Sequence, residues 1–118
     1  MRVQTVYVGM VPKDKDRRVS VNVSQNDANF VLRIGLVAED ADFVIESGTS
    51  ARIQGKKADG TPYTASASLN GKYAVVNGDR NMTNVAGTGV YEIRLTHGGK
   101  ELYSSNFNLV VEPRPTNE

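Results

Sequence analysis

Alternation of apolar and polar residues is the feature that most constrains how this chain folds. Val19, Val21 and Val23 alternate with polar residues. This period of two is expected of a strand with one buried face, because successive strand side chains point to opposite sides. The same period recurs along the sequence and predicts about eight strands with almost no helix. The expected strands lie at residues 6–8, 19–24, 30–36, 51–57, 65–69, 73–75, 91–96 and 107–111.

Glycine-containing turns separate several of these runs. Asp59-Gly60 lies between two of them, and Asn70-Gly71 lies between two others. An Asn-Gly pair is typical of a two-residue type I′ turn, in which both residues have positive φ. His97-Gly98-Gly99-Lys100 joins the last two long strands. We expect these glycines to serve backbone geometry and nothing else.

One segment departs from the strand period. Met82 and Val85 are at helical spacing, with Asp79 before them as an N-cap and Gly87 after them as a stop signal. The pattern predicts one short helical turn near Met82–Ala86. We expect it to cross the end of the β-structure and to close that end of the core.

These elements favour an all-β fold, an antiparallel two-sheet immunoglobulin-like β-sandwich. The 118 residues are enough for one domain, expected at residues 1–112 and followed by a polar tail or linker at 113–118. Tyr91 precedes Ile93 by two residues, so it is either a tyrosine-corner residue or an ordinary core aromatic. The expected core is Val21, Leu32, Ile34, Ile53, Leu69, Val75, Tyr91, Ile93, Phe107 and Leu109.

Composition excludes several kinds of protein. The sequence has no cysteine, which excludes disulfides, thiolate zinc sites and cysteine nucleophiles. Its 14 Lys and Arg residues against 13 Asp and Glu residues give a net charge of +1, which argues against a nucleic-acid binder. No apolar run approaches the roughly 20 residues of a membrane span, and no signal peptide opens the chain.

The search for catalytic chemistry finds little. His97 is the only histidine, and it lies in a glycine-rich turn where solvation is the more common role. A serine nucleophile needs an adjacent base, and no serine lies in a Gly-x-Ser-x-Gly elbow. Gly87-Thr88-Gly89 resembles part of a phosphate loop, but it leads into a strand and not a helix. We expect no enzyme, no catalytic residue, no cofactor and no small-molecule substrate.

Two charged segments also favour solvated loops. The acidic cluster Glu39–Asp42 has oxygen ligands suited to calcium, but it lacks the Asp-x-Asp-x-Asp-Gly pattern of a calcium loop. In the segment Lys13–Arg18, basic and acidic residues are interleaved, so the local charge nearly cancels. We therefore expect no metal site at the first and no nucleic-acid site at the second.

Four ordered blocks between Ser24 and Glu112 resemble a known family. Together the blocks cover most of the chain. They are Val23–Phe30 with a Gln-x-Asp strand entry, Ile53–Gly60 with a Gly-x-Lys-x-Asp-Gly hairpin, Gly78–Gly87 with a Met-Thr-x-Val-Ala-Gly helical turn, and Lys100–Phe107 with a Glu-Leu-x-Thr-x-Asn-Phe strand. Ser104 replaces the threonine of the last motif. In these blocks the chain resembles the immunoglobulin-like N-terminal domain of phage baseplate upper proteins.

The resemblance implies a structural role. It implies a component of a phage or prophage tail baseplate that docks fibre or receptor-binding subunits and is located in the virion. Such a protein is made in the bacterial cytoplasm, its partners are other tail or baseplate proteins, and it forms a homo-oligomer, a trimer by analogy with tail fibres. Family members continue into coiled-coil, fibre or receptor-binding regions, whereas this sequence ends at Glu118. It is either a piece of a longer protein or a short stand-alone subunit.

Docking would bury apolar side chains on an outer face or edge of the β-structure. An alternative function is a carbohydrate-binding or surface-adhesin β-sandwich module, which would use the exposed tyrosines among Tyr7, Tyr63, Tyr73 and Tyr103. The candidate interface residues are Tyr7, Val31, Val76, Val90, Tyr103 and Val110.

Overall fold

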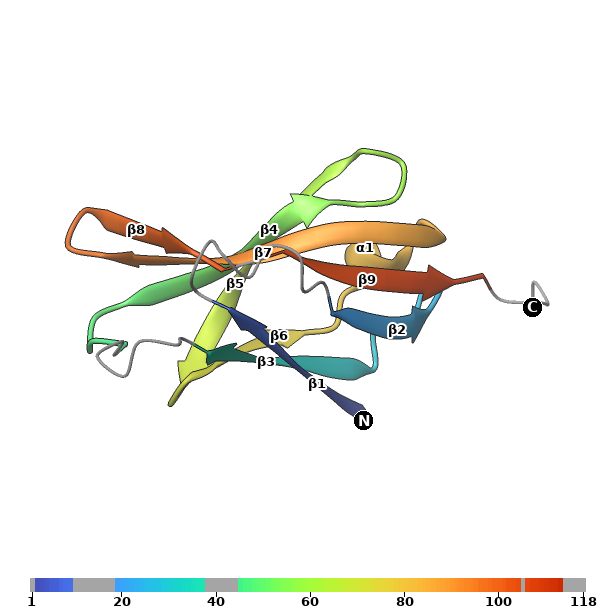
Figure 1. The fold of residues 1–118 in the computed structure, drawn as a ribbon. Helices are drawn as coiled ribbons and strands as arrows, with labels where there is room; N and C mark the ends of the chain where they lie inside the picture. Colours follow the sequence, from blue (N-terminus) through green and yellow to red (C-terminus); the bar gives the residue numbers. More distant parts are fainter. Residues whose placement is uncertain (1, 10–18, 38–44, 105, 114–118) are drawn as a thin grey trace.

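Nine strands and one short helix make up the part of the chain that the structure describes (Figure 1). The computed structural model describes residues 2–9, 19–37, 45–104 and 106–113. The expected acidic loop at Glu39–Asp42, the basic segment Lys13–Arg18 and the tail at 114–118 lie outside these residues. The elements are β1 (Arg2–Gly9), β2 (Ser20–Ser24), β3 (Phe30–Val37), β4 (Ser50–Lys56), β5 (Pro62–Asn70), β6 (Tyr73–Asn77), α1 (Arg80–Thr83), β7 (Gly87–His97), β8 (Lys100–Tyr103) and β9 (Phe107–Glu112).

Eight of the strands form one continuous path, in the order β1-β3-β6-β5-β4-β7-β9-β2, and β8 pairs with β7 off this path. Strand β5 links two layers, because its first part pairs with β4 and its last residues, Ser68–Asn70, pair with β6. Figure 1 shows β5 crossing steeply from the layer of β4, β7 and β9 to the layer of β6, β3 and β1. The all-β prediction is confirmed, but the layers belong to one sheet and not to two separate ones.

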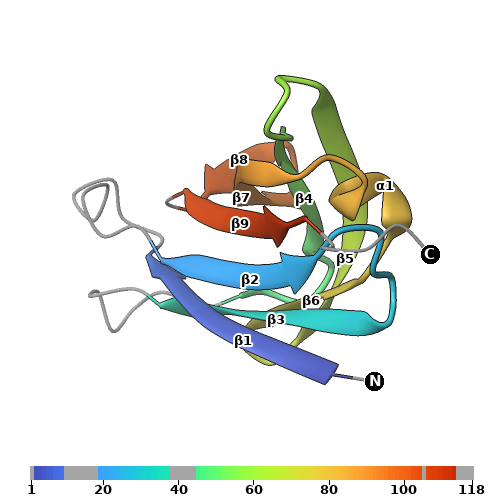
Figure 2. The same cartoon turned by 90° about the vertical axis from the view of Figure 1, so that its right-hand side faces the viewer.

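The two ends of this path meet. In Figure 2, β2 lies between β9 and β1, so the first and last strands of the path are neighbours. The side-chain amide of Gln4 on β1 donates to the backbone carbonyl of Asn22 on β2 at 3.1 Å. The sheet is therefore nearly closed into a barrel, and side-chain contact bridges the seam between β1 and β2.

The expectation of antiparallel pairing throughout is wrong. Strand β1 pairs with β3 in parallel register, and β2 pairs with β9 in the same way, while the other pairs are antiparallel. The physical reason lies in the order of the layers. Along the chain, β2 comes between β1 and β3 and lies in the opposite layer. The chain therefore returns to its starting end before β3 is added beside β1. A parallel pair needs such a crossover.

The core lies between the layers and follows the alternation of the sequence. The side chains of Leu32, Ile34, Ile53, Ile93 and Phe107 are fully buried. Val21, Tyr91 and Leu109 are buried as well, whereas Leu69 and Val75 are only half-buried. Eight predicted core positions are therefore confirmed. Leu69 packs at the margin of the core, whereas Val75 lies on the outer face.

In strand β6 the buried side chains are not the predicted one, Val75, but its neighbours. Its buried residues are Ala74 and Val76, while Tyr73 and Val75 point to the outer face. Val76 is 1% exposed, so its prediction as an exposed interface residue is wrong. The run Tyr-Ala-Val-Val carries apolar side chains on both faces, and a period of two cannot choose between them.

Two local predictions are also corrected. Asn70 is the last residue of β5 and pairs with Tyr73, so the two-residue turn is Gly71-Lys72, with positive φ at Gly71 as in a type II′ turn. The helix spans Arg80–Thr83 and ends three residues earlier than expected. Its predicted N-cap is confirmed, because the Asp79 carboxylate accepts from the backbone N–H of Asn81 at 3.0 Å. Met82 is buried as expected.

Candidate functional site

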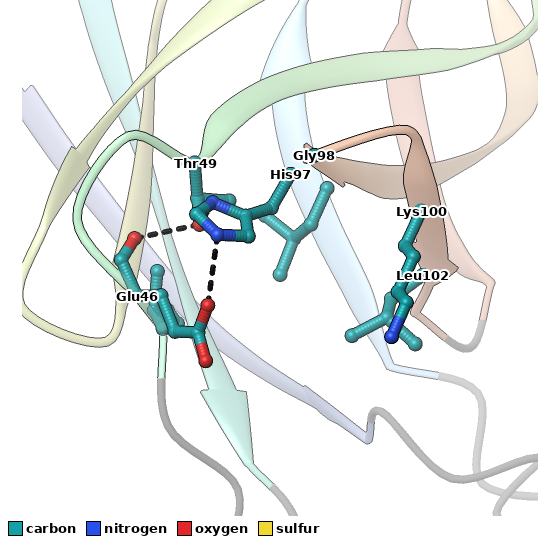
Figure 3. A pocket seen from close by; sticks show the side chains of 8 residues that line it. Glu46, Thr49, His97, Gly98, Lys100 and Leu102 are labelled. Atoms are coloured by element: carbon teal, nitrogen blue, oxygen red, sulfur yellow. Dashed lines mark hydrogen bonds and ion pairs between the residues drawn. The ribbon is translucent and has the colours of Figure 1, made fainter.

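A shallow pocket of about 310 Å³ lies between the β7–β8 hairpin and the turn that precedes β4 (Figure 3). Leu95 and Leu102 form its apolar wall from β7 and β8. The other lining residues are Ile45, Glu46, Thr49, His97, Gly98 and Lys100. Gly98 and Gly99 both have positive φ, which is what a tight two-residue hairpin between β7 and β8 requires.

His97 lies on the rim of this pocket beside a carboxylate and a hydroxyl. Its Nε2 is 2.8 Å from the Glu46 carboxylate, and its Nδ1 is 3.4 Å from Thr49 Oγ1. Figure 3 shows two interactions of Glu46, the contact of its carboxylate with His97 Nε2 and the bond from the Thr49 hydroxyl to its backbone carbonyl at 2.6 Å. The Thr49 hydroxyl proton is therefore directed to a backbone carbonyl, and the three groups link the turn before β4 to the end of β7.

A second surface is built from the outward side chains of β1, β3 and β6, and we call it the tyrosine face. The alternation along each strand turns these side chains away from the core, and the pairing register places them in rows. Val3 lies beside Val31, Thr5 beside Arg33, and Tyr7 beside Gly35. The face consists of Val3, Thr5, Tyr7, Val31, Arg33, Gly35, Val37, Tyr73, Val75 and Asn77.

The centre of the tyrosine face is tightly organised. Gly35 lies between Tyr7 and Tyr73 in the pairing register, and the Tyr7 ring covers it so closely that a Cβ at Gly35 would lie 2.4 Å from Tyr7 Cδ1. The two hydroxyls are 3.3 Å apart, and this hydrogen bond raises the pKa of Tyr7. The guanidinium of Arg33 lies 3.7 Å from the centre of the Tyr73 ring in a cation–π contact.

The outer face of β5, β4, β7 and β8 has a different character. Its outward side chains are mostly hydroxyls, amides and charges, and several of them are paired. Gln54 donates to Glu92 at 2.8 Å, and Arg94 forms an ion pair with Glu101. Tyr103 donates to the same Glu101 carboxylate at 2.8 Å. These contacts satisfy polar groups within the face, which is typical of a solvated surface.

The predicted interface residues do not form one patch. Tyr7 and Val31 lie on the tyrosine face, where Tyr7 is 55% exposed and Val31 is half-buried. Val90 and Val110 are half-buried on β7 and β9 in the other layer, and Tyr103 lies on β8. With Val76 in the core, the sequence prediction selected residues from several separate surfaces.

Three members of the tyrosine face that matter most beside Tyr7 are not among the interface residues predicted from the sequence. Val3 is 61% exposed and Val37 is 49% exposed, while Arg33 stacks on a tyrosine. The alternation of side chains along β1 and β3 was the signal in the sequence that could have found them. Residues four apart on one strand share a face, so Val3 accompanies Tyr7, and Arg33 accompanies Val37.

Several solved structures are similar to this chain, among them a phage domain and CopC. The N-terminal domain of phage TP901-1 ORF48 is similar with a TM-score of 0.70 and 12% identity, over 95% of this chain and 99% of that chain. CopC from Methylosinus trichosporium OB3b is similar with a TM-score of 0.55 and 9% identity, over 87% of this chain and 93% of that chain. No protein-family model and no curated protein sequence matches the chain. The chain thus has the fold of a phage N-terminal domain, as the sequence resemblance implied.

Among the residues that the structure describes, no group of three or more His, Cys, Asp or Glu side chains is arranged to hold a metal ion. Within the same residues, no helix has the length and apolar character needed to cross a membrane.

Proposed function

We propose that this domain is a structural component of a phage or prophage tail baseplate, an assembly module that docks fibre or receptor-binding subunits. The observation that carries the proposal is the fold shared with the N-terminal domain of phage TP901-1 ORF48 over nearly the whole of both chains. The four sequence blocks between Ser24 and Glu112 support the same assignment, because each contributes a structural feature of the fold. The Met-Thr-x-Val-Ala-Gly block, for example, contains the buried Met82.

The physical mechanism is burial of an outer sheet surface against a neighbouring protein, with no chemical step. The arrangement around His97 supports this non-enzymatic role, since the Thr49 hydroxyl donates to a backbone carbonyl and the imidazole pairs with Glu46. The partners are other proteins of the tail, and the domain resides in the virion. A homo-oligomer, in particular a trimer, belongs to the same proposal.

The proposal is tested on phage particles. An antibody against this domain should label the distal end of the tail in electron micrographs of particles induced from the host strain. Antibody first adsorbed with the purified domain serves as the control and should give no label. Particles that carry the major tail protein but lack this domain would refute the proposal, and so would label found only on the bacterial surface.

The alternative is a carbohydrate-binding or surface-adhesin module, and one observation favours it. Tyr7 is 55% exposed beside Tyr73, so the tyrosine face offers an aromatic surface to a sugar ring. Tyr63 and Tyr103 are less suitable, because their hydroxyls donate to Asp79 and Glu101. Saccharide binding on a glycan array that disappears in a Tyr7→Ala variant would support this alternative over assembly.

A further inference from the structure

We infer that the tyrosine face is the surface through which this domain docks, and that its partner presents a carboxylate framed by apolar side chains. The inference rests on the proposed function for the statement that the partner is a protein of the phage tail. It adds which face makes the contact and what chemistry the partner must offer.

Exposed apolar side chains gather on this face. Among the described residues, five large apolar side chains are exposed, and three of them, Val3 (61%), Tyr7 (55%) and Val37 (49%), lie on the tyrosine face. The other two, Leu102 and Tyr103, lie on β8. Half-buried Val31 and Val75 extend the same apolar surface across β3 and β6. A contiguous exposed apolar patch is a common mark of a protein interface, whereas single scattered residues are not.

The face is also organised before any partner arrives. The pairing register fixes Tyr7, Gly35 and Tyr73 side by side, and the hydrogen bond between the two hydroxyls links the rings. The stack of Arg33 on Tyr73 restrains the guanidinium in the same way. Side chains that are already ordered lose little conformational entropy on binding, and Tyr and Arg are the residue types that most often dominate interface energies.

The charge on the face identifies the partner's chemistry. None of the outward side chains of β1, β3 and β6 is acidic, so Arg33 has no carboxylate partner on its own face. A guanidinium that stacks on an aromatic ring keeps the N–H groups of its edge available, and their planar arrangement matches a carboxylate. Because apolar side chains surround Arg33, the complementary surface is a carboxylate framed by apolar groups.

The test compares matched substitutions on two faces. In a lysogen that lacks its own copy of the gene, the full-length protein is supplied with Tyr7→Ser or Arg33→Glu on the tyrosine face. The controls are Tyr103→Ser and Arg52→Glu, the same changes at residues on the opposite layer. The readout is the amount of the protein per major capsid protein in purified particles, measured by quantitative mass spectrometry.

We expect each substitution on the tyrosine face to lower incorporation by about tenfold, since interface Tyr and Arg residues commonly contribute that much or more. The control variants should be incorporated within about twofold of the wild type, as expected of a solvated surface. Arg33 is exposed, so Arg33→Glu should keep the wild-type circular dichroism spectrum and lower the melting temperature by no more than about 5 °C, the effect of losing its contact with the Tyr73 ring. That check separates lost docking from lost folding, and Arg33→Gln provides a second variant without charge reversal.

The other outcomes overturn the inference in distinguishable ways. Normal incorporation of the tyrosine-face variants, with wild type present in the particles, shows that docking uses another surface. Normal incorporation combined with lost adsorption to host cells assigns the face to a host saccharide and not to a tail protein. If the wild-type protein is absent from the particles, the proposed function is refuted, and the inference is refuted as well.

Discussion

At the scale of single residues, two glycines allow close approaches that any side chain would prevent. A Cβ at Gly55 on β4 would lie 2.1 Å from the backbone oxygen of Val90 and 2.7 Å from the Cα of Tyr91. A Cβ at Gly35 would meet the side chain of Tyr7, with Cδ1 at 2.4 Å. Both glycines have ordinary strand conformations, so they are needed for space and not for positive φ. The two positions differ in which atoms would have to move to make room for a Cβ. At Gly55 these atoms belong to the backbone of a paired strand, which moves far less easily than the exposed Tyr7 ring at Gly35.

This difference predicts the cost of two alanine substitutions. We expect Gly55→Ala to lower the free energy of unfolding by about 3 kcal/mol or more and Gly35→Ala by about 1 kcal/mol, the upper and lower parts of the range for overpacking. Urea denaturation of the two variants measures both values. In a Tyr7→Ala background, Gly35→Ala should lower the free energy of unfolding much less than it does in the wild type, because the ring that the new Cβ would meet is gone. Equal losses for the two single variants would contradict this explanation.

At the scale of elements, Ser104 continues the hydrogen bonding along the edge of β7 between the parts that pair with β8 and β9. Strand β9 pairs with the first part of β7 and β8 pairs with its last part, and Ser104 lies where the chain passes from β8 to β9. The backbone N–H of Ile93 donates to Ser104 Oγ at 2.8 Å, and the N–H of Ser104 donates to the Ile93 carbonyl at 2.9 Å. Ser104 thus fills the interval between the two strands with its backbone and its side chain.

Removal of this hydroxyl should leave a buried backbone donor without its acceptor. We expect Ser104→Ala to lower the free energy of unfolding by about 1–3 kcal/mol, the usual cost of an unsatisfied buried polar group. Chemical denaturation measures the loss. Ser66→Ala on the exposed face of β5 is the matched control and should change stability by no more than about 0.5 kcal/mol. A Ser104→Ala variant as stable as this control would mean that the hydroxyl is not needed to satisfy Ile93.

At the scale of the whole molecule, closure of the sheet buries an aromatic cluster between the layers. The ring of Tyr91 lies 6.1 Å from that of Tyr63 and 6.2 Å from that of Phe107, measured between ring centres. Tyr91 is 1% exposed, and this burial raises its pKa to about 12. Burial raises the pKa of Tyr63 as well, together with its hydrogen bond to Asp79. The folded protein therefore keeps these phenols neutral at a pH where the unfolded chain ionises.

This linkage predicts loss of stability in alkali. A tyrosine in the unfolded chain ionises near its ordinary pKa of about 10, so between pH 10 and about 12 the unfolded chain binds fewer protons at Tyr91 than the folded protein does. The stabilisation is complete below pH 10 and decreases as the pH rises through this window. Urea unfolding at successive pH values, with phenolate absorbance, measures the slope.

Tyr91→Phe is the variant that tests this assignment. It should make the alkaline fall of the unfolding free energy less steep, and the raised pKa values of Tyr63 and Tyr7 should account for part of the slope that remains. An unchanged slope in Tyr91→Phe would show that burial of Tyr91 is not a source of the alkaline sensitivity.

Alternation along the sequence was enough to locate eight of the nine described strands and most of the core, but it did not predict β8 (Lys100–Tyr103). The period of two placed Leu32 and Ile34 inside β3 and Tyr91 and Ile93 inside β7, because alternation within one strand is a local property. It also determined the N-cap at Asp79, which depends only on the next few residues. The pattern failed at β6, where apolar residues occupy both faces.

How the strands pair and which surface they expose depend on the tertiary structure. Sequence alternation does not say that β1 pairs in parallel with β3, that β5 joins both layers, or that β2 returns to β1. The tyrosine face depends on this pairing, since Tyr7, Arg33 and Tyr73 come from three different strands. Contacts between strands distant in sequence arise from the packing of the whole molecule, so no local pattern could have brought these three residues together.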